Sequence, residues 1–245
     1  MKAVILAGGI GSRLAPYTTI LPKPLMPVGE MPIIELLIRS LKKHDVKQIT
    51  LSVGYLSSLL MAYLGNGEKL NIPIEYSHEA EPMGTAGPLA LAEGLDSTFM
   101  AMNGDLLTDL DFRKIVAHHR ENKADATVGV YQREVKIDFG VIKADPTGQL
   151  TDYIEKPSFQ YLVSMGVYVL EPSVLDFIPS HTRFDFPDLI KALMAANKRV
   201  CGYVHTGYWL DIGRPDDYVR AQNEVPLLAP YYQEARVATS PQAIR

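Results

Sequence analysis

The sequence has little cysteine, no long apolar run and no excess of basic residues. A single cysteine, Cys201, excludes an intramolecular disulfide and a thiolate metal cage. No apolar run approaches the ~18 residues of a membrane span, and the apolar stretch 3–7 is shorter than the ~7–15 residues of a signal-peptide core. A formal net charge of −4 argues against a nucleic-acid or anionic-membrane binder. We therefore expect a cytoplasmic protein that binds neither nucleic acid nor membranes.

What the sequence does contain is a regular alternation of short apolar runs and segments of helical spacing. In the first half, strands are predicted at 2–7, 48–53, 73–76 and 98–102, and helices at 32–44, 56–64 and 85–94. This alternation predicts βαβ units around a mainly parallel sheet, and thus the α/β class. From about residue 125 the pattern favours a mixed sheet, with strands at 126–132, 140–143, 150–154, 162–170 and 199–205 and helices near 172–177, near 187–196 and from 215.

The clearest chemical signal follows the first strand, in the segment Leu6-Ala7-Gly8-Gly9-Ile10-Gly11-Ser12-Arg13. Glycines allow positive φ and bring backbone N–H groups close to a bulky anion. The segment is neither a dinucleotide-binding nor a Walker loop, since Leu14 replaces a third glycine and no Gly-Lys-Ser/Thr closes it. An ordinary tight turn is the alternative. Arg13 and the proline-flanked Lys23 add two cations, and together these features predict a polyphosphate cradle.

Continued by Pro22-Lys23-Pro24-Leu25, the segment resembles the signature of the sugar nucleotidylyltransferase (NDP-sugar pyrophosphorylase) family. The resemblance runs on through Glu81–Leu89, Asn103-Gly104-Asp105, Glu155-Lys156-Pro157 and Trp209–Gly213, over roughly residues 2–222. In Glu81–Leu89 it is most similar to the mannose-1-phosphate guanylyltransferase branch. It implies a Rossmann-like, doubly wound, mostly parallel mixed sheet of the nucleotide-diphospho-sugar transferase type. Longer members carry a C-terminal β-helix or acyltransferase module, and we expect none here.

The same resemblance implies a domain organisation. A catalytic domain is expected over 1–222, with a nucleotide-binding half at about 1–124 and a sugar-phosphate-binding half at about 125–222. The tail, 223–245, lacks a strong pattern. It either packs on a partner subunit of a homodimer or is loose, and the sequence leaves both readings open.

The family's reaction is an in-line attack by a sugar-phosphate oxygen on the α-phosphorus of a nucleoside triphosphate, with pyrophosphate leaving. It needs no protein nucleophile, so catalysis consists of positioning and charge neutralisation. We expect Arg13, Lys23, Asp105 and Lys156 to be catalytic. Asp105 closes a buried strand at its carboxyl end, where open α/β sheets bind ligands. With Asp211 it would hold Mg²⁺, which takes one or two carboxylates plus phosphate oxygens; aspartates that merely cap turns are the alternative.

For the sugar phosphate, the resemblance implies that Lys156 contacts the phosphate and Glu155 accepts hydrogen bonds from sugar hydroxyls. Gly140 and Gly104 would present backbone to the sugar. One departure concerns Ser164, which with Met165 stands where much of the family has Asn-Ala. Since Ser offers one hydroxyl and Asn an amide, the sugar stays open between mannose, another hexose, a heptose and a cyclitol.

For the nucleotide, Gly84 and Thr85 would bring backbone close to base and ribose, or Thr85 caps a helix. Glu81 favours guanine, because a carboxylate accepts from both N1–H and the exocyclic amine; an ordinary surface glutamate is the alternative. We therefore expect GTP. UTP or dTTP with another sugar or cyclitol phosphate, and a non-catalytic regulatory homologue, remain alternatives. A glycosyltransferase would use an Asp-x-Asp motif, for which Asp109-Leu110-Asp111 is the candidate, but these aspartates are expected to start a helix.

Overall fold

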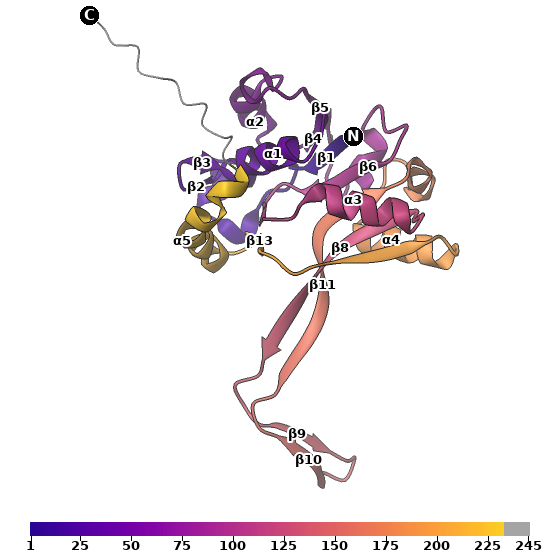
Figure 1. Ribbon diagram of the computed structural model, residues 1–245. Helices are drawn as coiled ribbons and strands as arrows, with labels where there is room; N and C mark the ends of the chain where they lie inside the picture. Colours follow the sequence, from indigo (N-terminus) through magenta and orange to yellow (C-terminus); the bar gives the residue numbers. More distant parts are fainter. Residues whose placement is uncertain (233–245) are drawn as a thin grey trace, which may run out of the picture.

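The computed structural model describes residues 1–232, and its centre is a seven-stranded sheet with helices on both faces (Figure 1). In spatial order the strands are β12 (Val200–His205), β8 (Ala126–Lys136), β11 (Ser158–Leu170), β6 (Phe99–Asn103), β1 (Lys2–Leu6), β4 (Gln48–Val53) and β5 (Ile74–His78). Neighbours run parallel except at β11, which is antiparallel to both β8 and β6. The expected mostly parallel mixed sheet is confirmed, and one sheet carries strands from both expected halves of the chain.

The α-helices are α1 (Ile33–Lys43), α2 (Ser57–Leu64), α3 (Phe112–Glu121), α4 (Phe186–Ala195) and α5 (Pro215–Tyr232). Successive side chains of a strand point to opposite faces of the sheet. Accordingly Ile5 of β1 packs in a core with α1, α2 and α3, whereas Val4 packs in a second core with α4. This division makes the sheet doubly wound, as the alternating pattern predicts. Among the helices of residues 1–232, none combines the length and apolar character that a membrane crossing requires.

Three expected features differ in the structure. The segment 85–94 contains only a short 3₁₀ helix, Gly87–Leu91, because the N–H groups of Ala86 and Gly87 are held by the Phe184 carbonyl and the chain is already extended at Ala92. The segment 172–177 is likewise a 3₁₀ helix. In addition, α5 runs past residue 222 and buries Leu228 and Tyr232 in a third core with α1. The expected tail therefore begins within a helix, and its residues 233–245 lie outside the described part.

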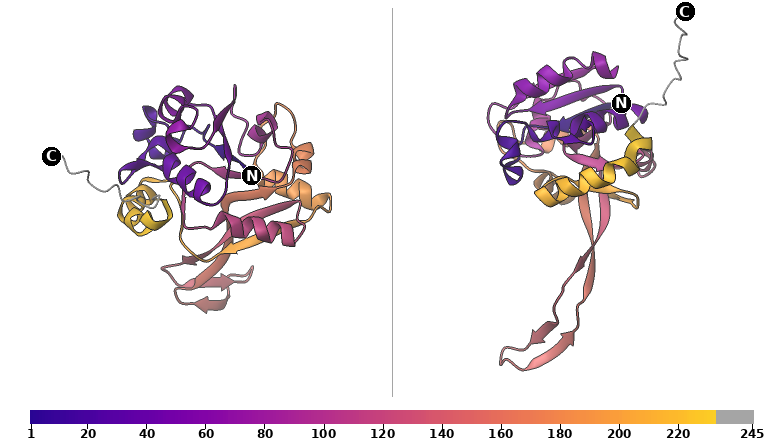
Figure 2. Two further views of the ribbon diagram at one scale, coloured as in Figure 1. Left: turned by 45° about the horizontal axis from the view of Figure 1, so that its top comes forward. Right: turned by 90° about the vertical axis from the view of Figure 1, so that its left-hand side faces the viewer.

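The outer halves of β8 and β11 form an arm, residues 131–163, that projects from the body in both Figure 1 and Figure 2. Within residues 1–232, β12 pairs with β8 only as far as Tyr131, and β6 pairs with β11 only from Val167 on. The outer halves of β8 and β11 therefore pair only with each other. The tip is a hairpin of β9 (Val141–Ala144) and β10 (Leu150–Ile154). Its turn is closed by the Asp145 carboxylate, which accepts hydrogen bonds from the backbone N–H groups of Thr147 (2.9 Å) and Gln149 (3.0 Å).

Two small ribbons complete the fold. They are β2 (Pro27–Val28) with β3 (Met31–Pro32), and β7 (Leu106–Thr108) with β13 (Trp209–Asp211). The second ribbon brings the chain after β12 back to the chain after β6. That return places the second expected metal ligand beside the first.

Candidate functional site

The site forms where β1 and β6 end side by side. Leu6 and Asn103 are partners in the parallel register, and the Gly104 N–H donates to the Leu6 carbonyl at 2.9 Å. The glycine-rich loop follows β1 and Asp105 follows β6, so both leave the same edge of the sheet. A side chain on Gly104 would come within 2.9 Å of the Leu6 carbonyl oxygen, which explains the glycine at this crossing. The Ala7 N–H donates to Ser52 of β4 at 2.8 Å and anchors the other side of the loop.

Lys23 lies directly against the glycine-rich loop. Gly11 has φ +68° and precedes the 3₁₀ turn Ser12–Leu14, and a Cβ at this position would lie 3.2 Å from the Cβ of Lys23. Glycine therefore serves both the left-handed backbone and the close approach. The loop and the second cation, which the sequence predicts to act together, are in contact.

Lys23 also forms a short ion pair with Asp105. The lysine side chain is 10% exposed and the aspartate side chain 20%, so the pair is largely removed from water. The second carboxylate oxygen of Asp105, Oδ1, is buried and has no hydrogen-bond partner. A buried acceptor without a donor is costly, and a cation or a donor group of a ligand would satisfy it.

Asp211 lies beside this pair. In the antiparallel β7–β13 ribbon Asp211 faces Leu106, and the backbone N–H of Ile212 donates to the Asp105 carbonyl at 3.1 Å. Burial, and next the Asp105 carboxylate, raise the pKa of Asp211 to about 6, against the opposing effect of the Lys23 and Arg13 cations. Two carboxylates therefore share one electrostatic environment.

Arg13 completes the cluster from the outside. It is exposed, and its guanidinium would lie 3.6–3.7 Å from a Cβ on Gly213, two residues after Asp211. The cluster therefore gathers Arg13, Lys23, Asp105 and Asp211 from four separate segments of the chain. It combines two cations suited to phosphate oxygens with two carboxylates.

The carboxylate pair fits a hard divalent cation. Among residues 1–232 no group of three or more His, Cys, Asp or Glu side chains gathers in a metal-binding arrangement. The chemistry of the donor set, two carboxylates beside two phosphate-binding cations, is of the kind with which Mg²⁺ is bound through one or two carboxylates plus phosphate oxygens. The unpartnered Oδ1 of Asp105 is the oxygen available to such an ion.

Gly84 and Thr85 are held against the start of α4. Gly84 has φ +81°, and a Cβ there would come within 2.7 Å of the Phe184 carbonyl oxygen. The N–H of Thr85 donates to Asp185 Oδ1 at 2.8 Å, and the Thr85 hydroxyl accepts from the N–H of Phe186 at 2.9 Å. Thr85 thus caps a helix, but a helix distant in sequence rather than its own.

Glu79 lies beside the glycine-rich loop, and sequence reasoning did not single it out as a candidate. It follows β5, its Oε1 accepts from the Ser52 hydroxyl at 2.9 Å, and its Oε2 accepts from the N–H of Met83 at 3.1 Å. A Cβ on Gly8 would collide with Oε1, so this carboxylate lies against the glycine-rich loop. Glu81 is exposed instead. An acidic residue directly after a parallel strand, the same signal that identified Asp105, could have identified Glu79.

The expected sugar-phosphate residues are divided between the body and the arm. Gly104 and Ser164 belong to the body; the Ser164 hydroxyl lies 3.1 Å from the Tyr168 hydroxyl where β11 bulges and turns into the arm. Gly140, Glu155 and Lys156 lie at the junction of the arm's ribbon with its tip hairpin. The structure therefore brings Arg13, Lys23, Asp105 and Asp211 together and does not bring Lys156 to them.

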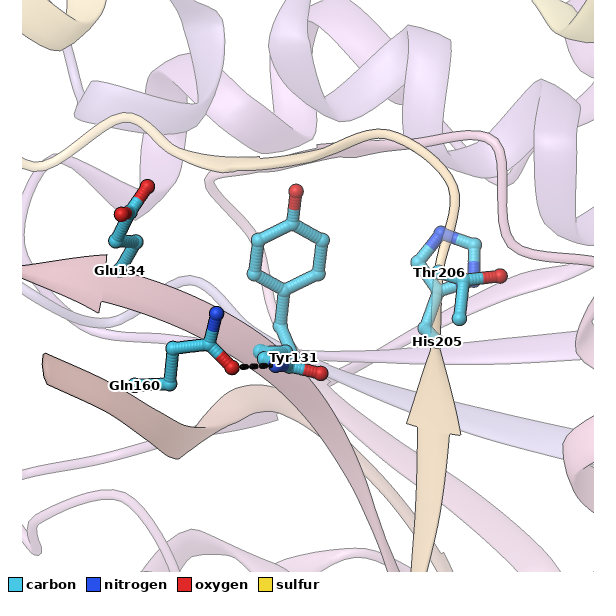
Figure 3. A pocket seen from close by; sticks show the side chains of 6 residues that line it. Tyr131, Glu134, Gln160, His205 and Thr206 are labelled. Atoms are coloured by element: carbon cyan, nitrogen blue, oxygen red, sulfur yellow. Dashed lines mark hydrogen bonds between the residues drawn. The ribbon is translucent and has the colours of Figure 1, made fainter.

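A cavity of about 260 Å³ lies at the root of the arm (Figure 3). Its walls come from the ribbon, through Tyr131, Gln132, Glu134 and Gln160, and from the end of β12, through His205 and Thr206. Tyr131 stands between Glu134 and His205 with its hydroxyl directed away from the ribbon. The cavity is therefore bounded by the root of the arm and by the chain that leads from β12 to β13.

Comparison with known proteins gives a consistent family. The family model described as "Nucleotidyl transferase" matches residues 2–226. The chain is similar to a mannose-1-phosphate guanyltransferase of Yarrowia lipolytica, 36% identical over 232 residues, and to a mannose-1-phosphate guanylyltransferase catalytic subunit beta of Dictyostelium discoideum, 36% identical over 227 residues. The matches cover 89% of this chain and 62% and 63% of those proteins, so the chain spans less than two thirds of their length.

A solved structure agrees. The crystal structure of HddC from Yersinia pseudotuberculosis complexed with GMP-PN matches with a TM-score of 0.70 and 26% identity. The match covers 91% of this chain and 99% of that one. Fold and sequence therefore lead to the same group of proteins.

Proposed function

The chain belongs to the nucleotidyl transferase family, and from this premise we propose that it transfers a nucleoside monophosphate, GMP before others, from an NTP to a sugar 1-phosphate with release of pyrophosphate. The observation that supports this most strongly is the cluster of Arg13, Lys23, Asp105 and Asp211 at the ends of β1, β6 and β13. A module that only binds sugar nucleotides has no need for two carboxylates of which one has a raised pKa because of burial beside the other.

In this proposal the cluster binds the triphosphate. The forked guanidinium of Arg13 and the compact ammonium group of Lys23 would bind phosphate oxygens beside the glycine-rich loop. The same oxygens would also accept hydrogen bonds from backbone N–H groups of the loop. Asp105 and Asp211 would hold Mg²⁺, and the ion would supply neutralisation of phosphate charge. Lys23 compensates the charge of Asp105 in the ion pair and lies against the glycine-rich loop, where it would bind a phosphate oxygen. An oxygen of the sugar phosphate then attacks the α-phosphorus in line.

Base recognition falls to the acidic segment after β5. Glu79 is fixed by Ser52 and Met83, and each of its oxygens retains a further lone pair for the N1–H and exocyclic amine of guanine. Uracil and thymine offer no such pair of donors. The bound GMP-PN in the HddC structure supports a guanine nucleotide here as well. Glu81 stays a prediction; its side chain is exposed.

The sugar phosphate is proposed to meet Lys156, Glu155 and Gly140, with Gly104 and Ser164 at the base of its site. The similarity to two mannose-1-phosphate guanylyltransferases favours mannose 1-phosphate. Because Ser164 and the buried Met165 stand where much of the family has Asn-Ala, another hexose, a heptose and a cyclitol phosphate stay alternatives to mannose. A cytoplasmic location remains part of the prediction.

The test is a substrate matrix. ATP, GTP, CTP, UTP and dTTP are each combined with several sugar 1-phosphates in the presence of Mg²⁺, and pyrophosphate release is measured. We expect the highest rate with GTP, and none in EDTA. Equal rates with UTP would remove the guanine assignment, and no release from any pair would overturn the proposed reaction.

A further inference from the structure

The ribbon of β7 and β13 carries Asp211, and it is short. It contains three residue pairs, from Leu106–Asp211 to Thr108–Trp209, and it is separate from the central sheet. A two-stranded ribbon of this length has little stability of its own in water. The position of Asp211 beside Asp105 therefore depends on what holds the two ends of the ribbon.

The register of this ribbon decides which way Asp211 points. Side chains alternate between the two faces of a strand, so Asp211 shares one face of β13 with Trp209, and Leu210 lies on the other. Leu210 is 5% exposed and packs in the third core. A slip of one residue would exchange the two faces and place the carboxylate in the apolar core instead of beside Asp105. The reaction proposed above thus requires a fixed register.

Asp109 holds the end of the ribbon that lies away from Asp105. Its N–H donates to the Tyr208 carbonyl at 3.2 Å, and its Oδ1 accepts from the Tyr208 N–H at 2.8 Å. The Thr108 hydroxyl donates to the same carbonyl at 2.8 Å. At the other end of the ribbon, the Ile212 N–H donates to the Asp105 carbonyl at 3.1 Å. Both polar groups of the Tyr208 backbone are therefore bound one residue before β13 begins.

His205 and Gly207 enclose the Asp109 carboxylate. His205 ends β12, and its Nε2 lies 2.9 Å from Asp109 Oδ1 and 3.2 Å from the Tyr208 carbonyl oxygen. Because a carboxylate and a carbonyl only accept, Nε2 carries a proton and donates to them. A Cβ on Gly207 would collide with the carboxylate. The side chains of His205 and Asp109 are 10% and 20% exposed, so their contact is largely removed from water.

We propose that Asp109 is a positioning residue for Asp211: by binding both polar groups of the Tyr208 backbone, it sets the register of β13. His205 orients the carboxylate that does so. The role rests on the proposed function, in which Asp211 would hold Mg²⁺ with Asp105. Loss of a group that orients a metal-binding residue lowers metal affinity by about 10–100-fold. Loss of the Asp109 carboxylate should therefore weaken the response to Mg²⁺ and leave sugar-phosphate binding unchanged.

Three substitutions disturb the contact to different degrees. Asp109→Ala leaves the N–H groups of Tyr208 and His205 without their acceptor, whereas Asp109→Asn keeps an oxygen that accepts from both. Gly207→Ala removes no polar group and brings a methyl group into the carboxylate; it also serves if Asp109→Ala folds poorly. We expect Asp109→Ala and Gly207→Ala to raise the half-saturating Mg²⁺ concentration for pyrophosphate release roughly tenfold, with KM for the sugar 1-phosphate within about twofold of wild type. Asp109→Asn should stay close to wild type.

Asp111→Ala is the matched control. Asp111 lies two residues further along the same segment, accepts from the Arg113 N–H at 3.1 Å as the cap of α3, and pairs with the Arg113 guanidinium at 2.8 Å. Its loss should lower Tm, because a helix loses its N-cap, and should leave the Mg²⁺ dependence unchanged. An equal shift of the Mg²⁺ dependence in Asp111→Ala would reduce the effect of Asp109→Ala to lost stability and overturn the proposal.

Amide hydrogen exchange in EDTA measures the register without metal or substrate. The Ile212 N–H reports on it, because it donates to the Asp105 carbonyl, whereas the N–H of the buried Val4 in β1 reports on global unfolding. Relative to Val4, Ile212 should exchange about tenfold faster in Asp109→Ala and in Gly207→Ala. In Asp109→Asn it should exchange at the wild-type rate.

These exchange rates also separate the positioning role from the proposed reaction. If wild-type protein releases no pyrophosphate from any substrate pair and Ile212 still exchanges faster in Asp109→Ala than in Asp111→Ala, the reaction fails and the register role stands. If the wild-type protein is active and the relative exchange rate of Ile212 is unchanged in Asp109→Ala, the reaction stands and the role of Asp109 is overturned. An unchanged Mg²⁺ dependence in an active Asp109→Ala enzyme would overturn it as well.

Discussion

The cluster around Asp105 and the patch around Lys156 differ in how the chain builds them. The cluster draws its residues from four distant segments, which the buried strands β1 and β6 and the β7–β13 ribbon bring together. The patch is made by Gly140 and by neighbours at 153–156, held by contacts within the arm itself. The comparison teaches that the cluster around Asp105 is held in place by the core and carries unfavourable buried charge. The charged residues of the patch are exposed, and the patch is held by contacts within the arm.

The largest expected effect lies in the cluster. Asp105→Asn and Asp211→Asn should each lower Mg²⁺-dependent pyrophosphate release roughly 10²–10³-fold, because each removes a charge that faces the cation and the leaving phosphates. The fold should persist by circular dichroism. Asp96→Asn, at an exposed aspartate, is the control and should be neutral. Activity within twofold of wild type in either cluster variant would separate the carboxylates from the reaction.

A smaller and more selective effect is expected on the arm. Lys156→Ala should raise KM for the sugar 1-phosphate roughly 10–100-fold through the loss of a charge-assisted contact, and leave KM for the NTP unchanged. Thermal stability should not change, since the side chain is 66% exposed. Lys143→Ala is the matched control, because Lys143 lies on the same arm and only pairs with Asp152 at 3.0 Å. A rise in KM for the NTP would instead assign Lys156 to nucleotide binding.

Base selection should respond more modestly. Glu79→Gln is expected to lower the GTP/UTP ratio of kcat/KM by about tenfold, since an amide presents one acceptor where the carboxylate presents two. Glu81→Gln tests the neighbouring carboxylate, which the sequence favours. A larger fall for Glu81→Gln would mean that the exposed segment rearranges around the base. An unchanged GTP/UTP ratio in both variants would show that other groups select guanine.

The smallest effect concerns the stability of the metal-free protein. Because the pKa of Asp211 is raised to about 6 in the fold, the folded state binds more protons than the unfolded state between about pH 4 and pH 6. Stability from this group is therefore present at low pH and is lost as pH rises through 6. In EDTA at pH 8, Asp211→Asn should be more stable than wild type by about 1–2 kcal/mol, since the carboxyl is partly solvated. This corresponds to a Tm higher by a few degrees.

The comparison of the two proteins at two pH values checks this sign. The difference in Tm should shrink at pH 5, where Asp211 is largely protonated in the fold. An equal difference at pH 5 and pH 8 would show that packing, and not charge, distinguishes the two side chains.

The sequence predicts the parts that depend on local pattern. The strands 48–53 and 150–154 have the expected bounds, and the helix expected at 32–44 is observed as α1 with Pro32 as its cap. Asp111 starts a helix as expected by accepting from the N–H of Arg113, whereas Asp109 instead accepts from Tyr208 and contacts His205. Such partners, distant in sequence, are invisible to periodicity.

The direction of the arm was also beyond the sequence. Period-two patterning identifies β8 and β11, but it does not tell where their pairing leaves the sheet. That point is set by the Tyr131–Trp209 contact and the bulge after Ser164, both of which join distant segments. The role of Glu79 depended in the same way on the contact of two loops, at Gly8 and after β5.

The turn at Asp145 has a consequence for the order in which the chain folds. The β9–β10 pair closes around it, and the β8–β11 pair closes around that hairpin, so each step joins ends that the previous step has already brought together. Contacts of this nested kind form quickly compared with the parallel crossovers of β1, β4 and β5. We therefore expect the outermost part of the molecule to form early. Once the arm has formed, we expect β11, which is antiparallel to both of its neighbours in the central sheet, to pair with β6.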